Sequence, residues 1–313
     1  MNNLIFVFVS LLVLTSCQSE SEKVNQQPQT LTVSNPAEDS KLSDYWYQGK
    51  AEINRYELQQ NRYKDTHPGE AVLVFVTEDF LTDKQVKNDN YSNPNSTGIL
   101  KMNGLRRFTT GLYDYSIMTS VFTPTDVRNQ PQTLKVTNSV QDWCGQTWMQ
   151  INKGERDYKV ELRSYFESEN DQNFKVDDVI LEDELFNRIR MNPTALPEGK
   201  MKVLPSATTV RMLHIDFAPV KAVLKSKSYV GTDFEGENLQ VYEVQYTDLN
   251  RTLEIVFEMK APYAIVGWKD TRPSVFDKQA RSTIAKRTHH TLSPYWSKNG
   301  LADTRLRAEL GLD

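Results

Sequence analysis

The chain of 313 residues is poor in cysteine, with only Cys17 and Cys144. Two cysteines cannot form the several disulfide bonds that stabilise small disulfide-rich proteins, so that class of protein is excluded. An excess of positive charge is missing too, because 37 Lys and Arg stand against 41 Asp and Glu, for a net charge of −4. Nucleic-acid-binding domains normally carry a basic patch. The composition therefore predicts no nucleic-acid partner.

The sequence motifs of common cofactor and catalytic sites are also missing. The chain has no GxxxxGK(S/T) or GxGxxG phosphate loop and no GxSxG nucleophile turn. None of its histidines has a second soft ligand at the spacing of a zinc site. These histidines are His67, His214, His289 and His290. The sequence therefore predicts no cofactor, no metal and no catalytic residue, and it favours a non-catalytic protein over an enzyme.

Acidic residues gather at 177–178 and 182–184. Paired carboxylates can act as acid and base in glycoside hydrolysis, where they face each other across the substrate, about 5–10 Å apart. Consecutive residues at the start of one helix point in different directions instead. We therefore interpret this cluster as helix capping and solvated charge.

One long apolar run is present, from Leu4 to Leu14, and it leads into Leu14-Thr15-Ser16-Cys17. The run is shorter than the roughly 20 residues of a membrane-spanning helix and is typical of a signal peptide. The tetrapeptide resembles a bacterial lipobox. That resemblance implies that residues 1–16 are removed and that Cys17 is the lipidation site, with a diacylglyceryl group on its sulfur and often a third acyl chain, such as palmitate, on its amine.

The segment 17–43 is polar and has almost no large apolar residues after the cysteine, which is typical of a flexible tether. Each buried methylene of an acyl chain contributes about 0.8 kcal/mol to membrane binding, so two or three chains anchor a protein stably. We expect a lipoprotein of the bacterial cell envelope, held at the outer membrane by lipidated Cys17. The periplasmic and surface faces remain alternatives, and Cys144 is left unpaired.

The remaining residues, 44–313, are predicted to form a strand-rich globular domain with a sub-boundary near the Pro-rich segment 192–205. Whether the two halves share one sheet is open. Alternating apolar and polar residues indicate strands separated by turns. The predicted hairpins join 143–151 to 156–166 and 239–247 to 251–258, further strands lie at 208–217 and 220–230, and the apolar run at 71–76 is expected to be buried on both faces.

A helix is predicted at 178–191, with Asp178 as its N-cap and Asn192-Pro193 after its end. A shorter amphipathic segment at 302–310 follows near the end of the domain. The fold class is therefore mainly β, an antiparallel meander of curved or barrel-like shape with one main covering helix. An α+β fold is the alternative.

Cys144 lies in Trp143-Cys144-Gly145, where a thiol beside a glycine raises the question of a nucleophile. A cysteine nucleophile needs a base within hydrogen-bonding distance and an environment that lowers its pKa. Free cysteine is among the most buried residue types. We therefore predict a packed core thiol.

Four stretches of the domain carry a resemblance to known proteins. They are DYWYQGKAE at 44–52, VLVFVTED at 72–79, QDWCG at 141–145 and LEDEL at 181–185. With them the chain resembles, over most of residues 44–270, a family of uncharacterised bacterial lipoproteins carried under the name "septum formation inhibitor Maf". That name implies a nucleotide pyrophosphatase with a Ser-x-Ser-Pro-Arg-Arg loop, but no proline of this chain precedes an Arg-Arg pair. No catalytic residue is carried across.

Three functions follow as hypotheses. The first is a lipid-anchored lipoprotein with a non-catalytic β domain that acts as a scaffold or binds an envelope protein or an apolar ligand. The second is a carrier or chaperone of lipid or lipoprotein, with an apolar cavity covered by the helix at 178–191. The third is an envelope hydrolase that uses Cys144.

Overall fold

The computed structural model describes residues 42–126 and 132–312, and its strands form one fifteen-stranded sheet in the order β8-β7-β6-β5-β4-β3-β2-β1-β15-β14-β13-β12-β11-β10-β9. The strands are β1 (Ala51–Arg62), β2 (Asp65–Leu81), β3 (Ser96–Thr110), β4 (Tyr113–Pro124), β5 (Lys135–Asp142), β6 (Gly145–Lys153), β7 (Asp157–Ser164), β8 (Gln172–Asp177), β9 (Ile180–Leu181), β10 (Gly199–Leu204), β11 (Val220–Ser228), β12 (Leu239–Tyr246), β13 (Arg251–Glu258), β14 (Ile265–Pro273) and β15 (Ala280–Ser293).

The helices of the described residues are short. They are α1 (Leu185–Met191), α2 (Ala207–Leu213) and α3 (Arg305–Glu309), with 3-10 turns η2 (Asp44–Tyr47), η3 (Glu182–Glu184), η4 (Pro193–Ala195), η5 (Tyr295–Ser297) and η6 (Leu301–Thr304). The mainly β composition predicted from the sequence is confirmed.

The chain builds the sheet as two meanders. It enters at β1, in the interior of the sheet, and runs through antiparallel neighbours to the edge strand β8. It then crosses to the opposite edge, where β9 and β10 pair in parallel, and returns through antiparallel neighbours to β15. Antiparallel pairing of β15 with β1 joins the meanders, so both halves of the described chain share one sheet.

The two edges of this sheet lie close together. In a flat sheet with strands about 4.8 Å apart, roughly 65 Å would separate the edges. However, β8 ends at Asp177 and β9 begins at Ile180, and three residue steps span at most about 11 Å. The sheet therefore curls until its edges approach each other, although β8 and β9 are not hydrogen-bonded neighbours in the described strand order. The expected curved, barrel-like meander is confirmed.

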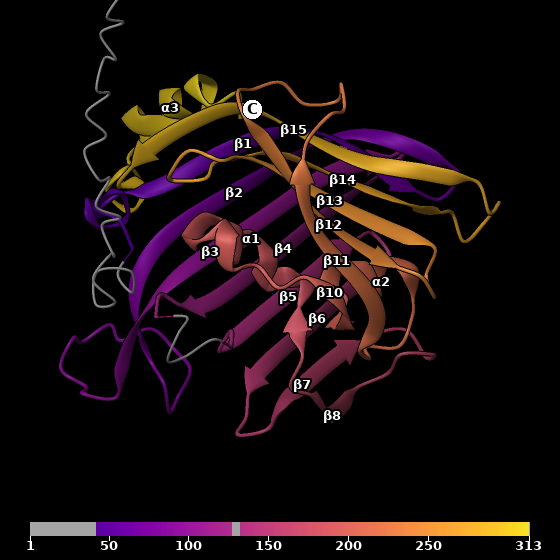
Figure 1. Cartoon of the computed structure of the whole chain (residues 1–313), viewed down its shortest axis with the longest axis horizontal. Coiled ribbons are helices and arrows are strands. Elements are labelled where there is room, and N and C mark those ends of the chain that lie inside the picture. The colour runs from indigo at the N-terminus through magenta and orange to yellow at the C-terminus, as the bar shows by residue number, and fades with distance from the viewer. Residues whose placement is uncertain (1–41, 127–131, 313) are drawn as a thin grey trace, which may run out of the picture. The chain divides into compact units, whose positions relative to one another are not determined.

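The core lies on the inner face of the curled sheet, where α1 packs against both meanders (Figure 1). On one side, Asn187 Nδ2 donates to the carbonyl oxygen of Leu100 in β3, at 3.0 Å. On the other, the ring of Phe186 lies edge-on to Trp268 of β14, with centroids 5.6 Å apart. The helix therefore fills the space between the meanders with side chains.

Both predicted hairpins are confirmed, as β6–β7 and β12–β13, and β11 occupies most of the predicted strand at 220–230. The apolar run at 71–76 has only one fully buried face, so that prediction is wrong in part. Leu73 is in the core, whereas Val72 and Val74 are half-buried on the outer face. The valines of this run all lie on the outer face, and because valine is apolar they hide the alternation in the sequence.

The helix predicted at 178–191 is shorter than expected. Ile180 and Leu181 form β9, and the 3-10 turn η3 precedes α1, so Asp178 is not its N-cap. Leu181 pairs with Leu204 of β10, and this pairing overrides the local preference for helix. The predicted end before Asn192 is confirmed.

The sequence pattern predicts a strand at 208–217, but these residues largely form α2. Ser206 Oγ accepts a hydrogen bond from the Thr209 N–H at 3.2 Å and caps the helix. Met212 packs with Phe108 and Tyr115 of the sheet. The two threonines and the valine of α2 favour a strand by propensity, but the cap and this packing decide the outcome.

Candidate functional site

The end of α2 places two polar side chains next to each other. Arg211 and His214 are three residues apart, the spacing that brings side chains together on a helical turn. His214 has φ +52° and ends the helix in the left-handed conformation. That conformation costs a residue other than glycine about 1 kcal/mol or more. The chain therefore holds this histidine in a strained position.

Arg211, His214 and Glu169 form a hydrogen-bonded chain. Arg211 Nε donates to Thr147 Oγ1 at 3.1 Å, and Nη1 donates to His214 Nε2 at 3.0 Å. His214 Nδ1 lies 2.6 Å from Glu169 Oε1. Arg211 Nη1 also lies 3.2 Å from His214 Nδ1. Because a carboxylate only accepts, Nδ1 donates to Glu169, and Nε2 is the ring nitrogen that can accept from Arg211.

The guanidinium of Arg211 is buried, with 6% of the residue exposed. Burial lowers the pKa of Arg211, and the carboxylate of Glu169 counteracts part of this effect. Glu169 Oε1 lies 3.9 Å from Arg211 Nη1, and its Oε2 accepts a hydrogen bond from Ser164 at 2.6 Å. Arg211 and Glu169 therefore form an ion pair without a direct hydrogen bond.

A pocket of about 230 Å³ lies beside this chain, and Arg211, His214 and Glu169 contribute to its lining. Inner-face residues of β6, β7 and β8, together with α2 and the segment after it, supply apolar lining. These apolar residues are Met149, Leu162, Phe174, Val210 and Phe217. Ser168 and Asp216 also line the pocket and are exposed, which puts them at its mouth. Polar and apolar groups together suit a small amphipathic molecule.

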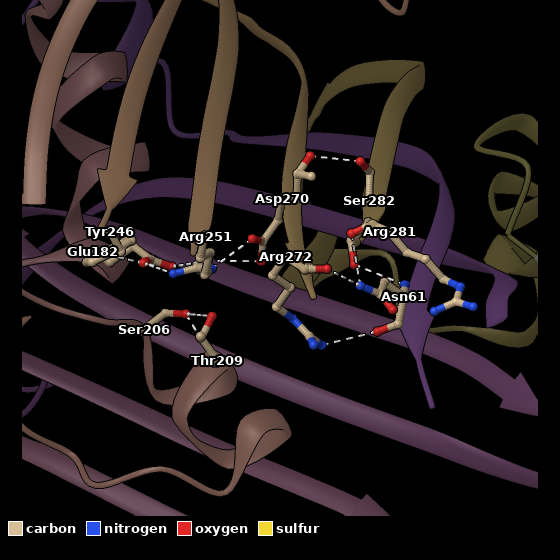
Figure 2. A network of polar contacts seen from close by, with 12 residues as sticks. Asn61, Glu182, Ser206, Thr209, Tyr246, Arg251, Asp270, Arg272, Arg281 and Ser282 are labelled. Atoms are coloured by element: carbon tan, nitrogen blue, oxygen red, sulfur yellow. Dashed lines mark hydrogen bonds and ion pairs between the residues drawn. The ribbon is translucent and has the colours of Figure 1, made fainter. Parts of the chain in front are cut away.

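A second polar cluster lies in the core and is drawn in Figure 2, where Arg251 stands between Glu182 and Asp270. Arg251 Nη2 donates to Glu182 Oε1 at 2.8 Å, and its Nε donates to Asp270 Oδ1 at 2.7 Å. Tyr246 donates to Glu182 Oε2 at 2.7 Å. Burial alone would lower the pKa of Arg251, but the two carboxylates raise it well above its ordinary value. These paired charges tie η3 to β12, β13 and β14.

Asp183 is buried beside this cluster, and its Oδ2 accepts a hydrogen bond from the Ala207 N–H at the start of α2, at 3.0 Å. Burial raises the pKa of Asp183 to about 7 despite this hydrogen bond, and the charge of Glu182 raises it further. Glu182 and Glu184 are buried as well. The interpretation of the acidic residues at 182–184 as solvated charge at a helix start is therefore wrong, because tertiary contacts enclose them.

A third cluster joins β1 to α1 through a buried ion pair between Glu52 and Arg190. Burial alone would raise the pKa of Glu52, but Arg190, the nearby His290 at 3.8 Å, and hydrogen bonds from Tyr45 and Asn54 lower it to about 2. The carboxylate is therefore held in its charged form and helps to fix α1 on the sheet.

The sequence predicts that Cys17 is lipidated and that the thiol of Cys144 is buried. Cys17 lies outside the described residues, so its lipidation stays a prediction. Cys144 is exposed in the turn between β5 and β6, where Asp142 Oδ1 accepts a hydrogen bond from the Cys144 N–H at 2.7 Å. The prediction of a packed core thiol is wrong, because the hairpin turn puts the residue at the surface.

Within residues 42–126 and 132–312, no group of three or more His, Cys, Asp or Glu side chains could hold a metal ion. No helix in that part of the chain is long and apolar enough to cross a membrane.

The sequence pattern does not predict that Arg211, His214 and Glu169 lie together. In a strand, which was the prediction for 208–217, residues three apart face opposite sides. A helical reading of the same segment would have brought Arg211 and His214 together. Glu169 lies 45 residues before His214, and no local pattern links them.

No known protein family matches this chain. No curated protein matches it either. Among solved structures, the chain is similar to a beta-barrel-like protein of the domain of unknown function DUF1849 from Brucella abortus, with 9% sequence identity and a TM-score of 0.40. The similarity covers 78% of this chain and 98% of that chain.

Proposed function

We propose that this protein is a lipid-anchored lipoprotein of the bacterial envelope whose β domain binds a ligand and catalyses no reaction. The lipobox-like Leu14–Cys17 and the polar segment 17–43 support the anchor. The pocket beside Arg211 supports the binding role. In this proposal the anchor lies in the outer membrane, and the face that carries the domain is left open.

The observation that favours binding over catalysis is the use of both ring nitrogens of His214. Acid–base catalysis needs a group that can exchange a proton with the substrate. His214 Nδ1 lies 2.6 Å from Glu169, and Arg211 Nη1 lies 3.0 Å from Nε2 and 3.2 Å from Nδ1, so both ring nitrogens contact partners within the protein. Cys144 is not among the residues that line this pocket. The ionic groups therefore hold one another in place and orient a ligand.

A small ligand fits this pocket better than a lipid cargo. Pockets for drug-sized molecules measure about 300–1,000 Å³, and this one measures about 230 Å³. Inside the curled sheet, the core space is occupied by Leu185, Phe186 and Ile189 of α1, all of them buried. We therefore favour a binding domain over the carrier hypothesis.

The anchor is tested with Cys17→Ala in a bacterial host grown with labelled palmitate. We expect the wild type to incorporate label and to sediment with membranes, and the variant to do neither, because the acylated sulfur is gone. Cys144→Ala is the matched control, since it removes the other cysteine, and it should behave like the wild type. Unchanged membrane sedimentation of Cys17→Ala would contradict the anchor.

A further inference from the structure

The guanidinium of Arg211 has donors left over at the pocket. Arginine carries five N–H donors in a planar fork. Nε donates to Thr147 and Nη1 donates to His214. Among the described residues, Nη2 donates no hydrogen bond, and Glu169 lies beyond hydrogen-bonding distance of Nη1. A buried positive charge with two nitrogens able to donate side by side matches the two oxygens of a carboxylate.

We infer that the pocket binds a small hydrophobic carboxylate, with its two oxygens on Nη1 and Nη2 of Arg211. This inference rests on the proposed binding function and names the class of ligand. The apolar part of the ligand would contact Met149, Leu162, Phe174 and Phe217, which lie in the same lining. Removing this surface from water adds to the affinity that the ion pair provides.

The volume limits the size of that apolar part. A cavity of about 150 Å³ in another protein holds one benzene molecule. At about 230 Å³, this pocket has room for one aromatic ring or a branched chain with a carboxylate attached. Either a free acid or the last residue of a peptide presents this chemistry, since both end in a carboxylate beside an apolar group.

Glu169 provides a prediction that separates ligand binding from a purely structural role of this cluster. Its negative charge lies 3.9 Å from Nη1 and opposes the entry of a second carboxylate. Glu169→Gln keeps an oxygen that can accept the proton of His214 Nδ1 and removes the charge. This variant should therefore bind a carboxylate more tightly than the wild type.

The test is calorimetric titration of the mature lipoprotein in detergent with 3-phenylpropionate and its neutral amide. We expect the acid to bind and the amide to bind about tenfold more weakly or not at all, because it lacks the charge that pairs with Arg211. Glu169→Gln should tighten binding of the acid about threefold. Arg211→Gln should abolish binding, and Arg107→Gln, at an exposed position on β3, is the matched control that should not change it.

A second variant keeps the test decisive if Arg211→Gln does not fold. Ser168→Trp places a bulky ring at the exposed mouth of the pocket and should prevent binding of the acid.

A tetrapeptide ending in phenylalanine distinguishes the two sources of the carboxylate. Binding of both ligands indicates a peptide terminus, and binding of 3-phenylpropionate alone indicates a free acid. Equal binding of acid and amide, or weaker binding by Glu169→Gln, would overturn the carboxylate assignment and leave the binding function standing. If the wild type binds neither 3-phenylpropionate nor the tetrapeptide, the carboxylate assignment is overturned as well. The membrane fractionation of Cys17→Ala tests the lipid anchor separately.

Discussion

At the scale of single residues, Asp183 makes the stability of the domain depend on pH. Its carboxyl is buried with a pKa of about 7, compared with about 3.9 in an unfolded chain. The folded state therefore binds one more proton between these values. The stabilising effect of the neutral carboxyl is complete below about pH 4 and is lost as the pH rises through 7.

We predict that Asp183→Asn gains stability relative to the wild type as the pH rises. The amide remains neutral and keeps an oxygen for the Ala207 N–H, so the difference should grow by up to about 1.4 kcal/mol per pH unit between pH 4 and 7. Urea unfolding at pH 5 and pH 8 measures this difference. Asp248→Asn, at an exposed position between β12 and β13, is the control and should show no such trend. A difference independent of pH would contradict the assignment.

At the scale of elements, α1 is a short helix that depends on tertiary contacts. Isolated helices shorter than about 12 residues are marginal in water, and α1 has 7. Asn187 is buried on this helix and donates from Nδ2 to Leu100 O and to Thr123 Oγ1, both at 3.0 Å. The amide of Asn187 therefore holds α1 against the first meander, together with the ion pair between Arg190 and Glu52 of β1.

We predict that Asn187→Ala destabilises the domain by about 1–3 kcal/mol, because it removes a buried hydrogen-bond donor and leaves acceptors of β3 and β4 without their partner. Chemical denaturation monitored by circular dichroism measures the loss. Asn173→Ala on β8, at an exposed position, should change stability by less than about 0.5 kcal/mol. Equal effects of the two substitutions would show that α1 does not depend on this contact.

At the scale of the whole described domain, the two meanders share one sheet and one core. The pairing of β1 with β15 runs from Ala51 with Ser293 to Gln59 with Ile284, and one core cluster contains residues of both meanders. Neither meander can open without exposing apolar surface that the other covers.

We predict that both meanders unfold in the same transition. Native-state hydrogen exchange should give the most protected amides of β4 and of β13 the same free energy of opening, equal to that of global unfolding. Ala285→Asp, at a buried position of β15 between β1 and β14, should lower both values together, because it puts an unpaired charge in their shared core. A lower opening free energy for one meander alone would show that they are separate units.

Much of the fold was predictable because it rests on local patterns. Alternation of apolar and polar residues located the hairpins at 143–166 and 239–258, and Asn192-Pro193 located the end of α1. The pattern failed at 208–217, where β-branched residues form a helix, and at 182–184, where a charged segment is buried. At 182–184 the deciding partners lie far along the chain, such as Arg251 for Glu182. At 208–217 the nearby cap Ser206 acts together with distant packing partners of Met212.

The sequence by itself determined the mainly β class, most strand positions and the expectation of a lipid anchor at Cys17, because each depends on residues adjacent in the chain. Only the tertiary structure decided that β15 pairs with β1, that the sheet curls until its edges approach, and that Glu169 meets His214 beside Arg211. These features depend on contacts between residues tens to hundreds of positions apart, and a local period carries no information about which distant segments meet.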